Sequence, residues 1–112
     1  MWLALTRLVM PFVYILKCAD GSYYTGSTID LDMRIAQHRA GYFKGYTSSR
    51  LPVELVWQQD FSTEHEAFLG ERQVKGWSRA KKEALIRGDF DAIHEIVKLE
   101  RKRREAKKSE QQ

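Results

Sequence analysis

The chain has 112 residues, which is enough for one domain built around one hydrophobic core. Hydrophobic residues make up 43% of it and charged residues 30%, a balance that argues against a wholly disordered protein. The formal charge of +4 arises at one end: residues 1–100 hold 13 Lys and Arg against 13 Asp and Glu, whereas residues 101–112 carry six bases and two acids. We therefore expect a domain at residues 11–100, followed by a helical, basic and flexible tail at residues 101–112.

The cysteine content and the N-terminal stretch restrict the environments that suit this chain. A single cysteine, Cys18, excludes an internal disulfide and a CxxC metal cluster, and it fits the reducing cytoplasm. The apolar N-terminal stretch is interrupted by Arg7 and Pro11, so it falls short of the roughly 20 residues that cross a bilayer. It also lacks the charge order and cleavage site of a signal peptide. We expect residues 1–10 to be an extension of a cytoplasmic protein that does not enter a membrane.

Two strands joined by a tight turn are predicted at the start of the domain. Phe12–Cys18 and Ser22–Ser27 are rich in β-branched and aromatic residues, with a turn sequence between them. A two-residue Asp-Gly loop would place Tyr14 and Tyr24 on opposite faces of the hairpin. A three-residue loop at 19–21, with its glycine in the left-handed bulge position, would place both tyrosines on one face. The sequence leaves both registers open.

Capping residues and apolar spacing predict four helices and a third strand after the hairpin. The first helix has Asp30 as its N-cap and ends near Ala40, before a loop at residues 41–50. Residues 53–58 alternate between apolar and polar side chains, which indicates the strand. Three further helices are predicted to begin after Ser62 or Thr63, after Ser78, and at Phe90.

These elements predict an α+β fold. We expect a small three-stranded antiparallel sheet, with its strands ordered as in the sequence and helices packed against it. Apolar residues at strand and helix spacing would then form the core. The residues expected to be buried are Val13, Ile15, Leu31, Ile35, Leu55, Phe68 and Val74.

Five residues with side chains that could carry chemistry are spaced along these elements. Tyr14 and Tyr24 lie ten residues apart on the two strands, and Arg34 follows after another ten. Arg34 and His38 are four residues apart, which places them on one face of the predicted helix, and Glu71 lies on the next helix. The tyrosines stand in the triplets Val-Tyr-Ile and Tyr-Thr-Gly. The ordered set resembles the GIY-YIG nuclease superfamily, and within it the small stand-alone members.

The resemblance implies a catalytic site and a cofactor. Glu71 would be the ligand of one divalent metal ion, Mg²⁺ or Mn²⁺, and Arg34 would contact the scissile phosphate. Tyr14, Tyr24 and His38 would surround the attacking water. One carboxylate suffices for such an ion because Mg²⁺ keeps most of its waters. A tyrosine of ordinary pKa near 10 needs nearby positive charge to act as a base; we favour Tyr24, although spacing does not decide among the three.

The basic residues Lys75, Arg79, Lys81 and Lys82 are candidate contacts to a DNA backbone, or else an ordinary exposed helix surface. The resemblance, which spans about residues 12–87, implies metal-dependent hydrolysis of DNA phosphodiester bonds in repair or processing. Branched or nicked DNA is the expected partner, recognised by structure or nonspecifically. Two alternatives remain: an RNA nuclease, and a catalytically idle nucleic-acid-binding or scaffold module. The nuclease interpretation requires the five residues to meet at one place.

Overall fold

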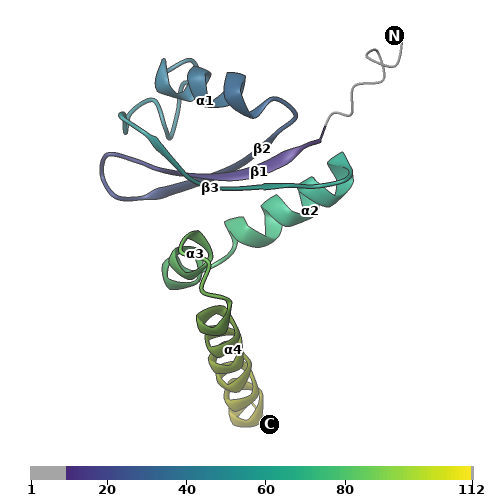
Figure 1. Cartoon of the computed structure of the whole chain (residues 1–112). Coiled ribbons are helices and arrows are strands. Elements are labelled where there is room, and N and C mark those ends of the chain that lie inside the picture. Colours follow the sequence, from purple (N-terminus) through teal and green to yellow (C-terminus); the bar gives the residue numbers. More distant parts are fainter. Residues whose placement is uncertain (1–9, 112) are drawn as a thin grey trace. The chain divides into compact units, whose positions relative to one another are not determined.

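The computed structural model of the chain describes residues 10–111, so nearly all of the expected extension at residues 1–10 lies outside the described part. The chain forms two compact units, residues 1–76 and residues 77–112. Within the described residues, the first unit holds a three-stranded antiparallel sheet with a helix on each face, and the second holds two helices (Figure 1). The predicted α+β class is confirmed. No helix of the described part is long and apolar enough to cross a membrane.

The sheet is built around the first strand. β1 (Phe12–Lys17) lies between β2 (Tyr23–Thr28) and β3 (Glu54–Asp60), and both pairings are antiparallel. This order corrects the prediction, which followed the sequence. Residues 13–16 are all 0% exposed, and a strand so fully buried is best placed at the centre, whereas the Ser- and Thr-rich β2 tolerates an edge. The pairing of β1 with β3 shifts register once, after Ile15.

The hairpin adopts the register of the three-residue loop. Tyr14 pairs with Gly26, and Gly21 has a φ of 83°, the left-handed conformation that this loop requires. Tyr14 and Tyr24 therefore lie on the same face of the sheet, with ring centroids 6.4 Å apart.

Two helices cover the two faces of this sheet. α1 (Leu31–Arg39) lies on one face and α2 (Glu64–Lys75) on the other (Figure 1). The N-caps are Asp30 for α1 and Thr63 for α2; each side chain accepts a hydrogen bond from a backbone N–H in the first turn. Gly41, with a φ of 72°, follows the end of α1. The predicted start and end of α1 are confirmed.

The core agrees with most of the predicted buried residues. Leu31 and Leu55 are only partly buried, packed against the cluster beneath α1. The prediction for Phe68 is wrong, because its side chain is 50% exposed. α2 instead turns Ala67 and Val74 inward, seven residues apart on one row, and Phe68 lies about 100° around the helix from Ala67. The predicted residues that are buried are Val13, Ile15, Ile35 and Val74.

The second unit consists of α3 (Arg79–Ile86) and α4 (Phe90–Glu110). Ser78 caps α3 and Asp89 caps α4, each by accepting from a backbone N–H of the first turn. Gly88, with a φ of 71°, separates them. The basic C-terminal segment is helical, as predicted, since α4 continues through it.

Candidate active site

A buried chain of hydrogen bonds links the central strand to α1 and the loop after it. The Tyr14 hydroxyl lies 2.8 Å from Nε2 of His38, and Nδ1 of His38 lies 2.9 Å from Oγ1 of Thr47. The three residues are 0%, 2% and 3% exposed. Because a neutral imidazole has one N–H and one acceptor nitrogen, both of its positions are used. These two hydrogen bonds fix the orientation of the His38 ring and of the Tyr14 hydroxyl.

Tyr24 is a partly exposed member of the aromatic cluster beside these hydrogen bonds. Its ring centroid lies 5.2 Å from that of His38, in an edge arrangement, and 6.2 Å from that of Tyr46, in a stacked one. Within the described part of the chain, the Tyr24 hydroxyl has no hydrogen bond to a protein group. It is therefore available to a water or a substrate oxygen.

Gly26 makes the position of Tyr14 possible. It pairs with Tyr14 across the hairpin, and a Cβ on Gly26 would lie 2.5 Å from the Tyr14 hydroxyl oxygen and 2.7 Å from Cζ. Both distances are far below van der Waals contact. The glycine of the Tyr-Thr-Gly triplet is thus required by the close approach of the tyrosine ring.

Arg34 and His38 are held together by an aromatic ring of the following loop. The guanidinium carbon of Arg34 lies 5.0 Å from the centroid of Phe43, and the His38 ring centroid lies 4.9 Å from the same ring. The first distance is that of a cation–π contact. Arg34 and His38 therefore both contact Phe43, and His38 is buried there.

Glu71 is positioned by two hydrogen bonds. Its Oε1 accepts from the Ser27 hydroxyl at 2.6 Å, and its Oε2 accepts from Nζ of Lys75 at 2.9 Å. Partial burial opposes ionisation, but these two donors and the Lys75 charge outweigh it and hold the pKa of the Glu71 carboxyl below its ordinary value. Glu71 is therefore ionised at neutral pH.

Glu71 lies on the other side of the sheet from the residues of α1. It lies on α2, whereas Arg34 and His38 lie on α1, and Ser27 alternates with Gly26 along β2. β2 is an edge strand, and its Ser27 hydroxyl donates to Glu71 at 2.6 Å, which ties the carboxylate to this edge. The charge of Arg34 contributes to lowering the pKa of Glu71. The carboxylate is thus within electrostatic reach of the guanidinium.

The buried groups of the α1 face are kept neutral. Burial, followed by the neighbouring Tyr24, raises the pKa of the Tyr14 hydroxyl to about 12, although Arg34 acts in the opposite direction. Burial, followed by the Arg34 charge, lowers the pKa of His38 below 6.5. At pH 7 the site therefore contains a protonated Tyr14, a neutral His38, a cationic Arg34 and an anionic Glu71.

The donor set fits a metal ion that needs few protein ligands. An ionised carboxylate offers about four lone-pair positions, and the two hydrogen bonds of Glu71 use two of them. The Glu71 side chain is 18% exposed. Across residues 10–111, no group of three or more His, Cys, Asp and Glu side chains gathers in a way that could hold a metal ion. A hydrated divalent cation that would be held by one carboxylate matches these residues, whereas a cage of protein ligands does not.

The four basic residues predicted to contact a DNA backbone differ in their ion pairs and their burial. Lys75 is paired with Glu71, at the candidate site itself. Arg79 forms an ion pair with Glu83 at 3.5 Å, and Lys82 is partly buried, which lowers the pKa of its ammonium. Two of these three cations thus have a carboxylate partner on the same helix.

Lys81 is engaged inside the helical unit. It is 8% exposed, its Nζ lies 3.1 Å from a carboxylate oxygen of Glu100, and it lies 4.8 Å from the centroid of the Trp77 ring. Its ammonium therefore stabilises the packing of α3 against α4 and is not directed at a solvent-side phosphate.

Sequence reasoning did not identify three supporting residues. Thr47 and Phe43 belong to the irregular loop after α1, where no periodicity indicates which side chains turn inward. Ser27 becomes visible only once the hairpin register is known, because alternation along β2 then directs it toward α2. All three hold a predicted site residue in place.

Comparisons with known proteins agree with this arrangement. A family model described as the GIY-YIG catalytic domain matches residues 10–84. The UPF0213 protein of Bacillus pumilus is 43% identical over 90 residues, which cover 78% of this chain and 92% of that protein. The UPF0213 protein of Halobacterium salinarum is 46% identical over 77 residues, covering 69% of this chain and 100% of the relative.

A solved structure has a similar fold. The solution NMR structure of a protein from E. faecalis matches 70% of this chain and 84% of its own, with 32% sequence identity and a TM-score of 0.50. The five residues on which the sequence resemblance rests, from Tyr14 to Glu71, all lie within the matched region. This chain therefore belongs to the GIY-YIG nuclease family, among its small single-domain UPF0213 proteins.

Proposed function

We propose that this protein is a metal-dependent endonuclease that hydrolyses DNA phosphodiester bonds, selecting its substrate by structure or nonspecifically, in DNA repair or processing. The observation that supports the proposal is that two phenols, a neutral imidazole and a guanidinium lie together on the α1 face, while the ionised Glu71 carboxylate, held by Ser27 of the edge strand, lies close enough for the Arg34 charge to lower its pKa. The Arg34 guanidinium can bind a phosphate, the Glu71 carboxylate can bind a hard cation, and the Tyr24 hydroxyl can hydrogen-bond to a water.

Arg34 and Glu71 supply the electrostatic part of the reaction. The Arg34 guanidinium binds the scissile phosphate and offsets the negative charge that develops during attack. Glu71 holds a Mg²⁺ or Mn²⁺ ion, which, when bound, adds positive charge at the phosphate and favours ionisation of a water. Ser27 and Lys75 keep the carboxylate ionised and fixed, so that it is preorganised for this task.

Tyr24 is the phenol that contacts the attacking water. Tyr14 is unsuited to that contact because it is 0% exposed, its pKa is raised to about 12, and its hydroxyl is already bonded to His38. Both ring nitrogens of His38 are likewise engaged. Tyr24 is partly exposed, and its hydroxyl has no hydrogen bond to a protein group among residues 10–111. Tyr14 and His38 act as positioning residues that hold its ring.

The experiment incubates the purified chain with supercoiled plasmid and with nicked and branched DNA, in Mg²⁺, in Mn²⁺ and in EDTA. We expect cutting that needs the ion and is abolished in Glu71→Gln. Glu66→Gln is the matched control, because Glu66 is an exposed acid on the same helix, and it should cut like the wild type. Cutting that persists in Glu71→Gln would remove the metal assignment.

The remaining alternatives are outcomes of the same assay. A wild-type chain that binds DNA but never cuts it, with either ion, would support the idle binding module. Cutting of single-stranded or structured RNA in preference to every DNA substrate would support the RNA nuclease. Either result would replace the proposal.

A further inference from the structure

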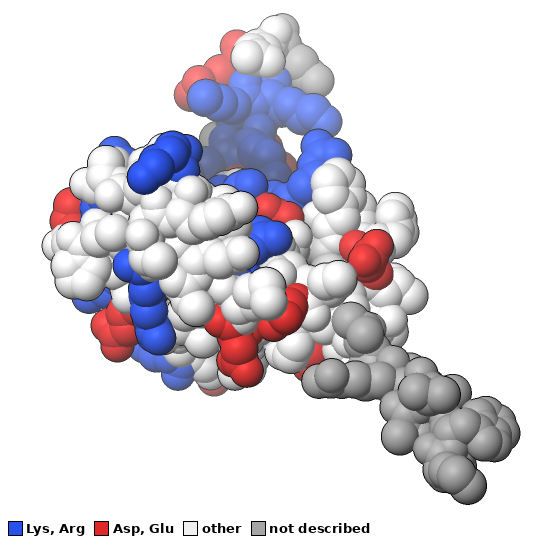
Figure 2. All heavy atoms as spheres, turned by 90° about the horizontal axis from the view of Figure 1, so that it is seen from above, with Lys and Arg blue, Asp and Glu red and all other residues white. Residues whose placement is uncertain are grey.

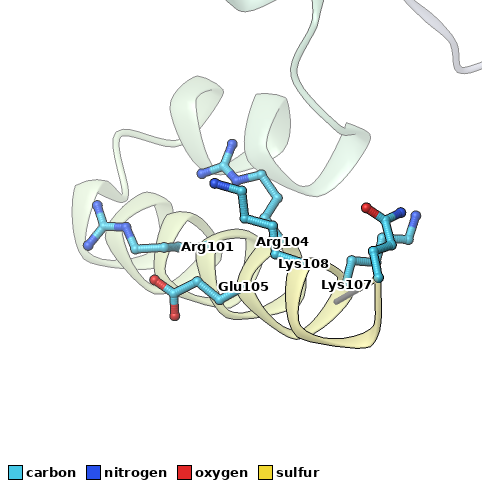
Figure 3. Close-up of a pocket in the computed structure, with 6 residues that line it drawn as sticks. Arg101, Arg104, Glu105, Lys107 and Lys108 are labelled. Carbon is cyan, nitrogen blue, oxygen red and sulfur yellow. The ribbon is translucent and has the colours of Figure 1, made fainter.

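The C-terminal half of α4, in the second unit, carries a charged surface of its own. We call residues 101–110 the basic arm. Its first eight residues read Arg-Lys-Arg-Arg-Glu-Ala-Lys-Lys, and every residue of the arm is exposed. Figure 2 shows Lys and Arg side chains gathered along α4, and Figure 3 shows Arg101, Arg104, Lys107 and Lys108 extending outward from the helix. The arm therefore adds nothing to the core.

The charges of the arm are arranged on one side. At 100° per residue, five of its six bases fall within an arc of about 160° around the helix axis. Glu105 lies outside that arc, and no ion pair forms between the arm's bases and its acids among the residues described. The five bases that share the arc are Arg101, Arg103, Arg104, Lys107 and Lys108.

The composition of the arm identifies the partner as a polyanion without an apolar surface. Ala106 is the only apolar residue between 101 and 110, so the arm has no apolar face to enter a lipid interface or a protein groove. Duplex DNA presents one negative charge per roughly 1.7 Å of its axis. An α-helix, about 10–12 Å across with its side chains, also matches a major groove about 12 Å wide.

We propose that the basic arm binds the phosphate backbone of duplex DNA and so holds the substrate for the candidate active site. The proposal rests on the proposed function for the identity of the nucleic acid. It is supported by the charge distribution: residues 1–100 carry equal numbers of acids and bases, so the C-terminal segment supplies the whole net charge of +4. Electrostatic affinity for DNA therefore depends mainly on the arm.

The test compares two variants of equal charge. The arm variant and the control variant each replace three exposed bases by glutamine, and in the helical arm glutamine preserves helix propensity. Binding to a short DNA duplex is measured in EDTA over a series of salt concentrations, and circular dichroism checks that helix content is unchanged. The arm variant carries Arg103→Gln, Arg104→Gln and Lys107→Gln. The control carries Lys17→Gln, Arg87→Gln and Lys98→Gln.

We expect the arm variant to bind more weakly and with a flatter salt dependence. Each lost phosphate contact reduces the magnitude of the negative slope of log K against log salt by about 0.9, so three lost contacts reduce it by roughly 2.7. The control should match the wild type. Equal slopes for the two variants, or a wild type that does not bind duplex DNA, would overturn the proposal.

Two further binding measurements test the choice of duplex DNA. A-form RNA duplex has a deep, narrow major groove, so we expect weaker arm-dependent binding to it. Equal arm-dependent affinity for RNA, or arm-dependent binding to phosphatidylserine vesicles with none to DNA, would overturn the assignment. Plasmid cutting is scored separately. If the wild type cuts plasmid but the arm variant keeps the salt dependence of the wild type, the proposal for the basic arm fails and the nuclease proposal stands. If the arm variant has the flatter salt dependence but the wild type never cuts plasmid, the nuclease proposal fails and the proposal for the basic arm stands.

Discussion

Replacement of Gly26 by alanine tests the closest contact in the candidate site. The added methyl would lie 2.5 Å from the Tyr14 hydroxyl oxygen, 2.7 Å from Cζ and 3.1 Å from Cε1. The tyrosine ring is fully buried and tied to His38 at 2.8 Å, so it cannot move away without losing that hydrogen bond. The clash must therefore be relieved by a shift of the ring or of β2.

The expected cost follows from these contacts. Overpacking a buried site costs about 1–3 kcal/mol, and loss of the Tyr14–His38 hydrogen bond adds about 1 kcal/mol. We expect Gly26→Ala to lower the free energy of unfolding by about 2–4 kcal/mol. At roughly 4 °C per kcal/mol for a chain of this size, the melting temperature should fall by about 8–16 °C.

Thermal and urea unfolding, followed by circular dichroism, measure this cost. Gly76→Ala is the matched control: a Cβ there meets nothing closer than 3.6 Å, and the backbone φ of −82° suits alanine, so its effect should stay within about 0.5 kcal/mol. In the Tyr14→Phe background, where the hydroxyl is absent, Gly26→Ala should cost about 1 kcal/mol less. A Gly26→Ala variant as stable as the control, or a cost that Tyr14→Phe does not reduce, would refute the reasoning.

Four further predictions concern the neighbouring residues. Thr47→Val leaves Nδ1 of the buried His38 unpaired and should cost about 1–3 kcal/mol in urea unfolding; no loss would mean that the hydrogen bond contributes nothing. Because the pKa of His38 is lowered in the folded state, the unfolded chain binds more protons below about pH 6.5, so the free energy of unfolding should fall as pH drops through that region, and His38→Gln should flatten the fall. Lys75→Met removes a donor and a charge that lower the pKa of Glu71, so the acidic limb of a pH–rate profile for DNA cutting should move to higher pH; an unmoved limb would contradict the pairing. Thr25 is 2% exposed and its hydroxyl has no hydrogen-bond partner among the described residues. Thr25→Val should therefore raise the free energy of unfolding by about 1 kcal/mol, measured as a higher melting temperature, and a lower melting temperature would show that the hydroxyl is hydrogen-bonded.

The sequence was sufficient for the local elements and for the list of candidate residues. Helix ends are set by short-range interactions, so the capping side chain of Asp30 and the left-handed backbone of Gly41 could both be read from residue type alone. The spacing of Arg34 and His38 likewise follows from helix geometry, because residues four apart share one face. Such features involve neighbours within one or two turns.

Only the tertiary structure decided which distant side chains meet. The hairpin register, and with it the placement of Tyr14 beside Tyr24, depended on one residue of loop length that the sequence left open. The central position of β1 and the exposure of Phe68 follow from how whole elements pack, which residue patterns within each element do not specify. The bond from Thr47 to His38, like that from Ser27 to Glu71, joins side chains from different segments, and such contacts arise only when the chain has folded.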